Sequence, residues 1–188
     1  MEKEVEERIG NLAKRYQSMK ILSPDLTGEL TKIRGEIDTE MRALSPEEQN
    51  MFTHNLRKRS IAVNGQEPQT HTGYGVVRDV FCDILVDRLS EAAQFRYNLI
   101  QNGLGSSKNA QDITASITNT MMSLPNDQFE VFTRALNSYV VPTENKGVAL
   151  NQSAINRMTF GIEEVRSICD TVTAQRMQMQ REGDGKDV

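Results

Sequence analysis

Apolar residues recur at steps of three and four over the last third of the chain. The clearest run consists of Ile155, Met158, Ile162, Val165, Cys169 and Val172. Side chains at this spacing lie on one face of a helix, so the run predicts an amphipathic helix from about Asn151 to Gln180. We call these six residues the seam, because they must pack along another helix. The seam is also a candidate interface for self-association. Gly161 interrupts the helix, where a close approach of a second helix or a bend would compensate for its low helix propensity.

Two apolar stripes predict helices at the N-terminal end. The first contains Val5, Ile9, Leu12, Tyr16 and Met19, and the second contains Leu26, Leu30, Ile33, Ile37, Met41 and Leu44. The first helix is expected over about Glu2 to Leu22. Proline suits the first position of a helix, so Pro24 predicts that the second helix starts there with Ser23 as its N-cap.

A third helix is expected to start at Pro46 and to run to about Arg59. Ser45 and Glu48 have the spacing of a capping box, in which each side chain bonds the other residue's backbone N–H. Residues 62–73 contain Asn64-Gly65, Pro68 and Gly73 without periodicity, which indicates a loop.

The longest apolar pattern runs from Gly75 to Asn102 and predicts a helix that Gly103 ends as C-cap. Apolar residues surround much of this helix, which is typical of a central element. A fifth helix is expected to be capped by Ser106 or Ser107, and a sixth to start at Pro125.

These elements predict an all-α protein, a bundle of seven helices with a long C-terminal amphipathic helix. Residues 1–60 form a helical layer, 61–74 the loop, 75–181 the main bundle, and 182–188 a polar disordered tail.

Four carboxylates follow one another at i+4 spacing on the long helix: Asp79, Asp83, Asp87 and Glu91. Because each i+4 step turns only about 40° around a helix, they form one acidic stripe. A solvated face is the simpler interpretation, and a docking strip for a basic element is the alternative. Arg57, Lys58 and Arg59 provide such an element, although cations near a helix end are also favoured by the helix dipole.

Arg88 falls within about 20° of Val77 around this helix, inside its apolar face. A buried arginine needs a partner, and Glu91 is the local candidate for an ion pair. Alternatively, Arg88 and Arg96 line a channel for a phosphate backbone, as Arg57, Lys58 and Arg59 could also contact phosphates.

The formal net charge of −4 provides no global attraction for nucleic acid. The N-terminal segment is charged, and no run approaches the roughly 20 apolar residues that span a bilayer. Cys82 and Cys169 without an export signal indicate reduced thiols in the cytoplasm, although a virion is also possible.

No motif indicates catalysis, a cofactor or a metal ion. His54 and His71 lack a second ligand at helical spacing. A helical metalloenzyme is therefore the least favoured class, with Asp83 and Asp87 as its first candidate ligands. The favoured interpretation is a non-enzymatic protein that self-associates, as a coat, nucleocapsid, matrix or scaffolding subunit. The alternative is a helical adaptor or regulator that acts through a coiled-coil-like dimer or binds another protein.

Overall fold

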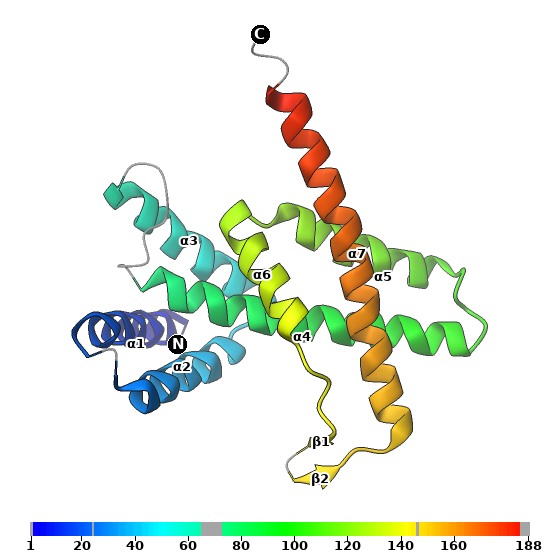
Figure 1. The fold of residues 1–188 in the computed structure, drawn as a ribbon, viewed down its shortest axis with the longest axis horizontal. Coiled ribbons are helices and arrows are strands. Elements are labelled where there is room, and N and C mark those ends of the chain that lie inside the picture. Colours follow the sequence, from blue (N-terminus) through cyan, green and yellow to red (C-terminus); the bar gives the residue numbers. More distant parts are fainter. Residues whose placement is uncertain (1, 24, 65–72, 146, 185–188) are drawn as a thin grey trace. The chain divides into compact units, whose positions relative to one another are not determined.

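The computed structural model of the protein describes residues 2–23, 25–64, 73–145 and 147–184, and within them the fold is all-α (Figure 1). Seven helices are present in these residues, together with one short antiparallel pair of strands. In chain order the elements are α1 (Glu2–Leu22), α2 (Thr27–Arg42), α3 (Pro46–Asn64), α4 (Tyr74–Gln101), α5 (Lys108–Ser123), α6 (Asn126–Ser138), β1 (Glu144–Asn145), β2 (Val148–Ala149) and α7 (Gln152–Asp184). The predicted seven-helix architecture and the long C-terminal helix are confirmed.

The chain divides into two compact units, residues 1–84 and 85–188. The division falls inside α4, which contributes its first part to unit 1 and its second part to unit 2. The sequence places the main boundary earlier, in the loop 61–74. Most of that loop, 65–72, lies outside the described residues, so the predicted domain limits stay a prediction.

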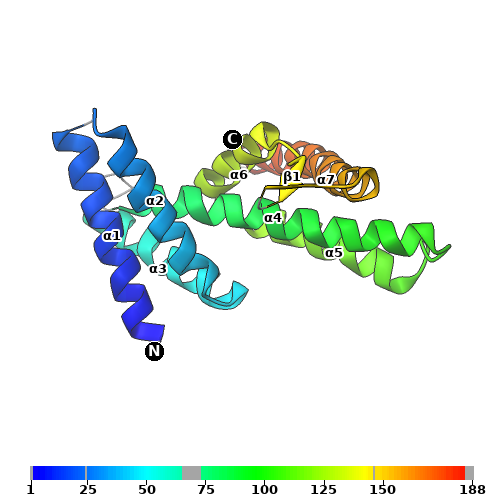
Figure 2. The ribbon, with the colours of Figure 1, turned by 90° about the horizontal axis from the view of Figure 1, so that it is seen from below.

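In unit 1, α1 and α2 lie side by side as an antiparallel hairpin (Figures 1 and 2). Buried apolar residues recur every four positions on each helix of the hairpin: Ile9 and Ala13 on α1, and Ile33, Ile37 and Met41 on α2. The helical spacing of these residues therefore defines the face along which the two helices pack.

The second helix begins later than the sequence predicts. Its first residue is Thr27, and Leu26 occupies the N-cap position without a side-chain cap. Ser23 does not cap it, because the Ser23 N–H donates to Met19 at the end of α1 and the Ser23 carbonyl accepts from Leu26. Ser23 thus continues the hydrogen bonding of α1, and Pro24, where the sequence places the start of the second helix, lies outside the described residues.

The start of α3 is as predicted. The Ser45 N–H donates to Glu48 Oε2 at 2.6 Å and the Glu48 N–H donates to Ser45 Oγ at 3.3 Å, which completes the capping box. The predicted end near Arg59 is wrong, since the helix continues to Asn64. Ser60, the first residue past the predicted end, is fully buried, which is consistent with its place inside the helix.

The ends of α4 and α5 agree with the glycine and serine signals. Gly103 has φ of +75°, and the Leu104 N–H donates to the Leu99 carbonyl at 2.8 Å, which closes α4. Ser107 caps α5 by accepting from the Ala110 N–H. In unit 2, α5 runs back along the second part of α4 (Figures 1 and 2).

The segment between α6 and α7 contains β1 and β2, which the sequence does not predict. Glu144 pairs with Ala149 and Asn145 with Val148, and Gly147 supplies a positive φ of +76° at the turn. Asn151 then caps α7 by accepting from the Ala154 N–H at 2.8 Å. The helix continues to Asp184, so residues 182–184 of the predicted disordered tail are helical, and 185–188 lie outside the described residues.

Candidate interaction surface

Three large apolar side chains are exposed together where α1 passes into α2. The exposed fractions are 58% for Ile21, 79% for Leu22 and 47% for Leu26. The late start of α2 explains the third, because Leu26 precedes the helix whose buried stripe it was expected to join. Isolated exposed apolar residues are ordinary on proteins, whereas a cluster of them indicates an interaction site.

Four basic side chains lie in the same half of the hairpin as these apolar residues. We define the tip as residues 14–32, which contain four basic and two acidic side chains. The basic ones are all exposed, and in the described part of the chain they form no ion pair: Lys14, Arg15, Lys20 and Lys32. The tip is therefore an apolar surface with an excess of uncompensated positive charge.

The opposite end of the hairpin is acidic. We define the open end as residues 2–11 and 36–42, which contain seven acidic and three basic side chains. Two of the basic residues are already paired inside the hairpin: Arg8 contacts Glu40 and Arg42 contacts Asp38, both at 2.9 Å. These two positive charges are neutralised by ion pairs within the hairpin, and an excess of carboxylates remains at the open end.

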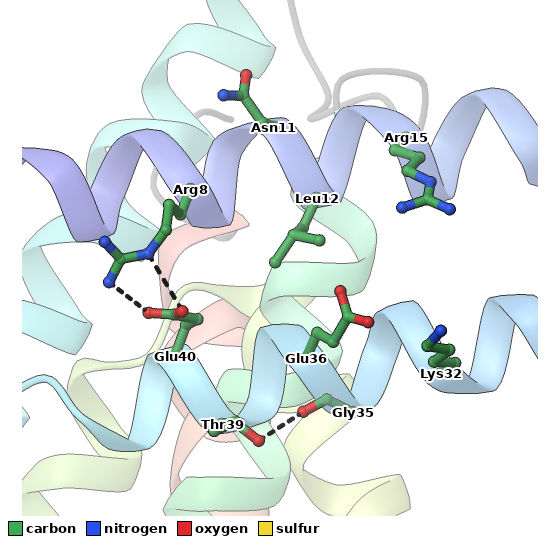
Figure 3. Close-up of a pocket in the computed structure, with 9 residues that line it drawn as sticks. All are labelled: Arg8, Asn11, Leu12, Arg15, Lys32, Gly35, Glu36, Thr39 and Glu40. Carbon is green, nitrogen blue, oxygen red and sulfur yellow. Dashed lines mark hydrogen bonds and ion pairs between the residues drawn. The ribbon is translucent and has the colours of Figure 1, made fainter.

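A groove of about 840 Å³ between α1 and α2 connects the two ends (Figure 3). At one end the Arg8 guanidinium makes two hydrogen bonds to Glu40, and hydrogen bonding to this carboxylate raises the pKa of Arg8. At the other end Arg15 and Lys32 face each other across the groove, with Leu12 between the two ends. Glu36 lines the groove beside these two cations, so a carboxylate is also present at this end.

Four of the six seam residues are buried inside unit 2, with exposed fractions of 3% or less: Ile162, Val165, Cys169 and Val172. Ile155 and Met158, nearer the start of α7, are half-buried. The predicted amphipathic face is thus present, but four of its side chains pack against their own chain. They cannot contact another chain while unit 2 is folded, which removes the original argument for the seam as an interface.

The acidic stripe of α4 is engaged with neighbouring arginines in unit 1. Asp83 pairs with Arg34 of α2, and Asp79 pairs with Arg78 at 3.0 Å. Asp87 is half-buried and Glu91 is exposed in unit 2. The partner of Asp83 is therefore a basic side chain of this chain, as one of the two interpretations expects, but it is Arg34 and not the cluster at 57–59.

The basic cluster lies inside α3 rather than at its end, because the helix extends to Asn64. Arg57 is half-buried, whereas Lys58 and Arg59 are exposed. Arg59 lines a groove of about 450 Å³ that also contains Glu6 and Glu7 of α1. The helix-dipole explanation for these cations no longer applies, since the dipole acts within the last turn.

Arg96 joins α4 to α7 in unit 2. Its Nη1 atom contacts Glu164 at 2.8 Å, and both side chains are mostly buried. Its Nε atom is buried without a hydrogen-bond partner. Arg96 also lines a groove of about 490 Å³ whose other walls carry only uncharged side chains of α5, among them Gln111 and Asn119. Arg88, the second predicted phosphate contact, is half-buried, and its proposed ion pair with Glu91 stays a prediction.

The remaining chemical candidates do not form a site within the described residues. No group of three His, Cys, Asp or Glu side chains there could hold a metal ion, and His54 is exposed. His71 lies outside the described residues. Cys82 and Cys169 are free and buried, and burial raises the pKa of the Cys169 thiol. None of the described helices has the length and apolar character needed to cross a membrane.

Sequence reasoning missed the tip. The signal was present in Ile21 and Leu22, which lie off the first apolar stripe and directly before Ser-Pro, but two apolar residues at a helix end are common. Comparison of the chain with protein-family models, curated proteins and solved structures finds no match in any of the three.

Proposed function

We propose that this is a non-enzymatic assembly protein that self-associates, as a coat, nucleocapsid, matrix or scaffolding subunit does. The observation that carries the proposal is the exposed apolar cluster of Ile21, Leu22 and Leu26. Burying such a cluster against another surface is favourable by roughly 25 cal/mol per Å² of apolar area removed from water. The tip therefore replaces the seam as the proposed interface.

The tip is suited to contact between proteins in a second respect. Ile21 and Leu22 are at the end of α1, and Leu26 directly precedes α2, so the three exposed side chains are at the ends of two helices. Side chains held at helix ends lose less conformational entropy on association than those of a flexible segment. A surrounding rim of charged residues is the usual composition of a protein interface.

The alternative is a helical adaptor or regulator in which the tip binds a different protein and no higher assembly forms. Both functions use the same surface, and they differ in what purified protein does alone. An assembly protein associates without a partner, whereas an adaptor stays monomeric or stops at a dimer.

Local contact with nucleic acid is a second candidate, and the groove at Arg96 supports it. This groove contains one arginine among uncharged polar side chains, and its lining residues include no carboxylate. Such a groove does not repel a phosphate backbone, although the paired Glu164 reduces the charge that Arg96 offers. We therefore retain Arg96, with Arg88 about two turns earlier on α4, as proposed nucleic-acid contacts.

Replacing a single tip residue tests the assembly proposal. Leu22→Ser removes an exposed apolar side chain from the tip, and Met51→Ser removes one of 54% exposure from α3 as the matched control. Light scattering after size-exclusion chromatography should show at least a roughly tenfold weaker self-association for Leu22→Ser and wild-type behaviour for Met51→Ser. Equal association of all three proteins would remove the tip from the interface.

A further inference from the structure

We propose that the end of α7 in one copy of this chain packs antiparallel against the same end of α7 in a second copy, about a two-fold axis. The inference rests on the proposed self-association, and it adds a contact in unit 2 to the one at the tip. It begins from four exposed residues of α7, which we call the α7 stripe: Asp170, Ala174, Met177 and Arg181.

The α7 stripe is one face of the helix and is distinct from the seam. Steps of four, three and four residues keep its side chains within a sector of about 60° around the helix. The nearest seam residues, Cys169 and Val172, are buried, whereas all four stripe residues are exposed. Uncharged side chains flank the stripe on both sides: Thr171, Thr173, Gln178 and Gln180. The α7 stripe is therefore an exposed face that carries charge only at its two ends.

The described part of the chain leaves the end of α7 uncovered. The helix continues for about 18 Å beyond Val172, its last buried residue, at 1.5 Å per residue. Its last turns extend past α6 (Figure 1), and every side chain from residue 177 to residue 182 is exposed. Most of the stability of a helix in a protein comes from packing of one face. Cover by a second helix would therefore stabilise this segment.

The charges of the α7 stripe favour a second copy in one orientation. Asp170 and Arg181 form no ion pair among the side chains that the structure describes. An antiparallel copy sets Asp170 against Arg181 at both ends of the contact, and it sets Ala174 against Met177 in the middle. A parallel copy would set like charges against each other, which is unfavourable. The stripe is thus complementary to itself in the antiparallel orientation.

The middle of the α7 stripe is suited to close packing of two helices. The distance between packed helices depends on the size of the side chains at the contact, and Ala174 is small. Met177, which is 49% exposed, has a flexible side chain that fills irregular gaps. The uncharged middle also carries no charge that would have to be desolvated when the two copies meet.

A groove of about 540 Å³ between α6 and α7 continues the contact surface, because Met177 and Phe129 both line it. The two helices are antiparallel, since Arg176 lies over the ring of Phe129 and Thr133 contacts Cys169. A second α7 that is antiparallel to the first is therefore parallel to α6, and its Met177 side chain can enter the groove beside Phe129.

The charged residues that line this groove are engaged within unit 2. Glu130 and Arg134 pair with each other at 3.4 Å. The third, Arg176, donates to the carbonyls of Met121 and Leu124. The groove therefore adds apolar contact to the proposed interface, while Asp170 and Arg181 determine its orientation.

The same surface meets itself in this contact, so the contact is isologous and closes at a dimer. The tip is a different surface and belongs to unit 1. A chain that uses both surfaces can join more than two copies, as an assembly protein requires. Each contact can also be disabled without the other.

The test uses full-length protein in which Ile21→Ser and Leu22→Ser remove the tip contact. We call this protein the background. Asp170→Arg, Arg181→Asp and the two substitutions together are introduced into it. Sedimentation velocity then measures the dissociation constant of the dimer for each protein.

Two charge reversals outside the α7 stripe are the matched controls. Asp112→Arg and Arg157→Asp make the same changes of charge at exposed positions of unit 2. Circular dichroism melts establish that every variant is folded before its association is measured. The controls should associate like the background.

We expect the background to form a dimer and each single reversal to raise its dissociation constant about tenfold, because like charges then face each other at two places. The double reversal should restore the dimer, since the same pairs form with opposite signs. Mixing the two single variants should yield a one-to-one heterodimer, although neither associates with itself. Raising the salt concentration should weaken the dimer of the background, because exposed charges are screened.

The inference and the assembly function fail in different ways. A background that is monomeric up to about 100 μM, or whose dimer is unchanged by both single reversals, would overturn the inference. A double reversal that associates as weakly as the single ones would overturn the antiparallel pairing. Background protein that associates like wild type would instead remove the tip from the interface. A monomeric wild type would overturn both proposals.

A disulfide between the copies tests the orientation in the presence of the tip. Asp170→Cys and Arg181→Cys in one chain should form intermolecular disulfides that join position 170 to position 181, because the two positions face each other. Gln175→Cys with Glu182→Cys is the matched control, since both positions are exposed and are turned more than about 100° away from Asp170. Peptide mapping identifies the joined positions, and disulfides that join 170 to 170 or 181 to 181 would contradict the antiparallel contact.

Discussion

The carbonyl oxygen of Ser90 lies 2.6 Å from the position that a Cβ atom on Gly161 would occupy. The backbone of α7 thus passes directly over α4 at a point where only glycine fits. Tyr97 and Phe160 pack next to this crossing with their ring centroids 4.7 Å apart. Of the two roles that the sequence allows for Gly161, the close approach of helices is therefore confirmed.

Gly161→Ala should destabilise the protein by about 1 to 3 kcal/mol, because the added methyl group must displace backbone rather than a flexible side chain. Gly35→Ala is the matched control in an exposed part of α2, where a Cβ meets nothing within 4 Å. That substitution should stabilise by about 0.5 to 1 kcal/mol through helix propensity. Urea denaturation gives the free energy of unfolding of each variant. If Gly161→Ala leaves it unchanged, the close approach of α7 to α4 at this residue is contradicted.

Arg176 of α7 should stabilise the connection between α5 and α6. Its guanidinium donates to the carbonyls of Met121 and Leu124 and to Asn126 Oδ1, and it lies 4.3 Å above the ring of Phe129. Arg176→Ala should cost about 1.5 to 3 kcal/mol in thermal or urea unfolding. Arg176→Lys should recover only part of this, since an ammonium lacks the planar fork. Arg157→Ala, at an exposed position of the same helix, should have little effect.

The stability of unit 2 should fall as the pH rises above about 8.5, the usual pKa of a thiol. Burial raises the pKa of Cys169 in the folded protein, so the folded state holds its proton more tightly than the unfolded state. This contribution is fully present below the unfolded pKa and is lost as pH rises through the folded pKa. Urea midpoints at several alkaline pH values should decline less steeply for Cys169→Ala, and an identical slope would exclude the thiol as a cause.

Arg96→Ala separates a structural arginine from a nucleic-acid contact. The ion pair with Glu164 predicts a lower melting temperature, and a double-mutant cycle with Glu164→Gln should show coupling between the two residues. If nucleic acid also binds there, affinity for a labelled single strand should be independent of sequence, should fall with salt, and should fall in Arg96→Ala and Arg88→Ala without loss of helicity. Binding of the labelled strand is followed by fluorescence anisotropy. If no binding is detected at low salt, a nucleocapsid function is excluded.

The sequence predicts the helices well because their ends carry local chemical signals. The capping box of Ser45 and Glu48, the serine at 107 and the glycine at 103 each satisfy backbone groups within a few residues. The predicted start of α2 is wrong because Ser23 is bonded to Met19 and Leu26, which the apolar pattern does not reveal. The predicted end of α3 is wrong as well, and fully buried Ser60 lies beyond the last residue that the local pattern assigns to this helix.

The surface was harder to predict than the helices. An apolar stripe shows that a helix face is buried, but it does not show whether the same chain or another chain covers it. The seam is the example, because Ile162 is 1% exposed inside unit 2 and Ile162→Asp should unfold that unit rather than dissociate an assembly. Leu22 is the opposite example, because its exposed fraction of 79% is apparent only from the structure and not from the apolar pattern.

Sedimentation velocity of the wild-type protein over about 1 to 100 μM tests the central claim most directly, because self-association is a property of the purified chain alone. We expect the weight-average sedimentation coefficient to rise with concentration, to pass the value of a dimer, and to fall again at high salt. A monomer at every concentration, with the helical circular dichroism spectrum of a folded protein, would contradict the assembly function.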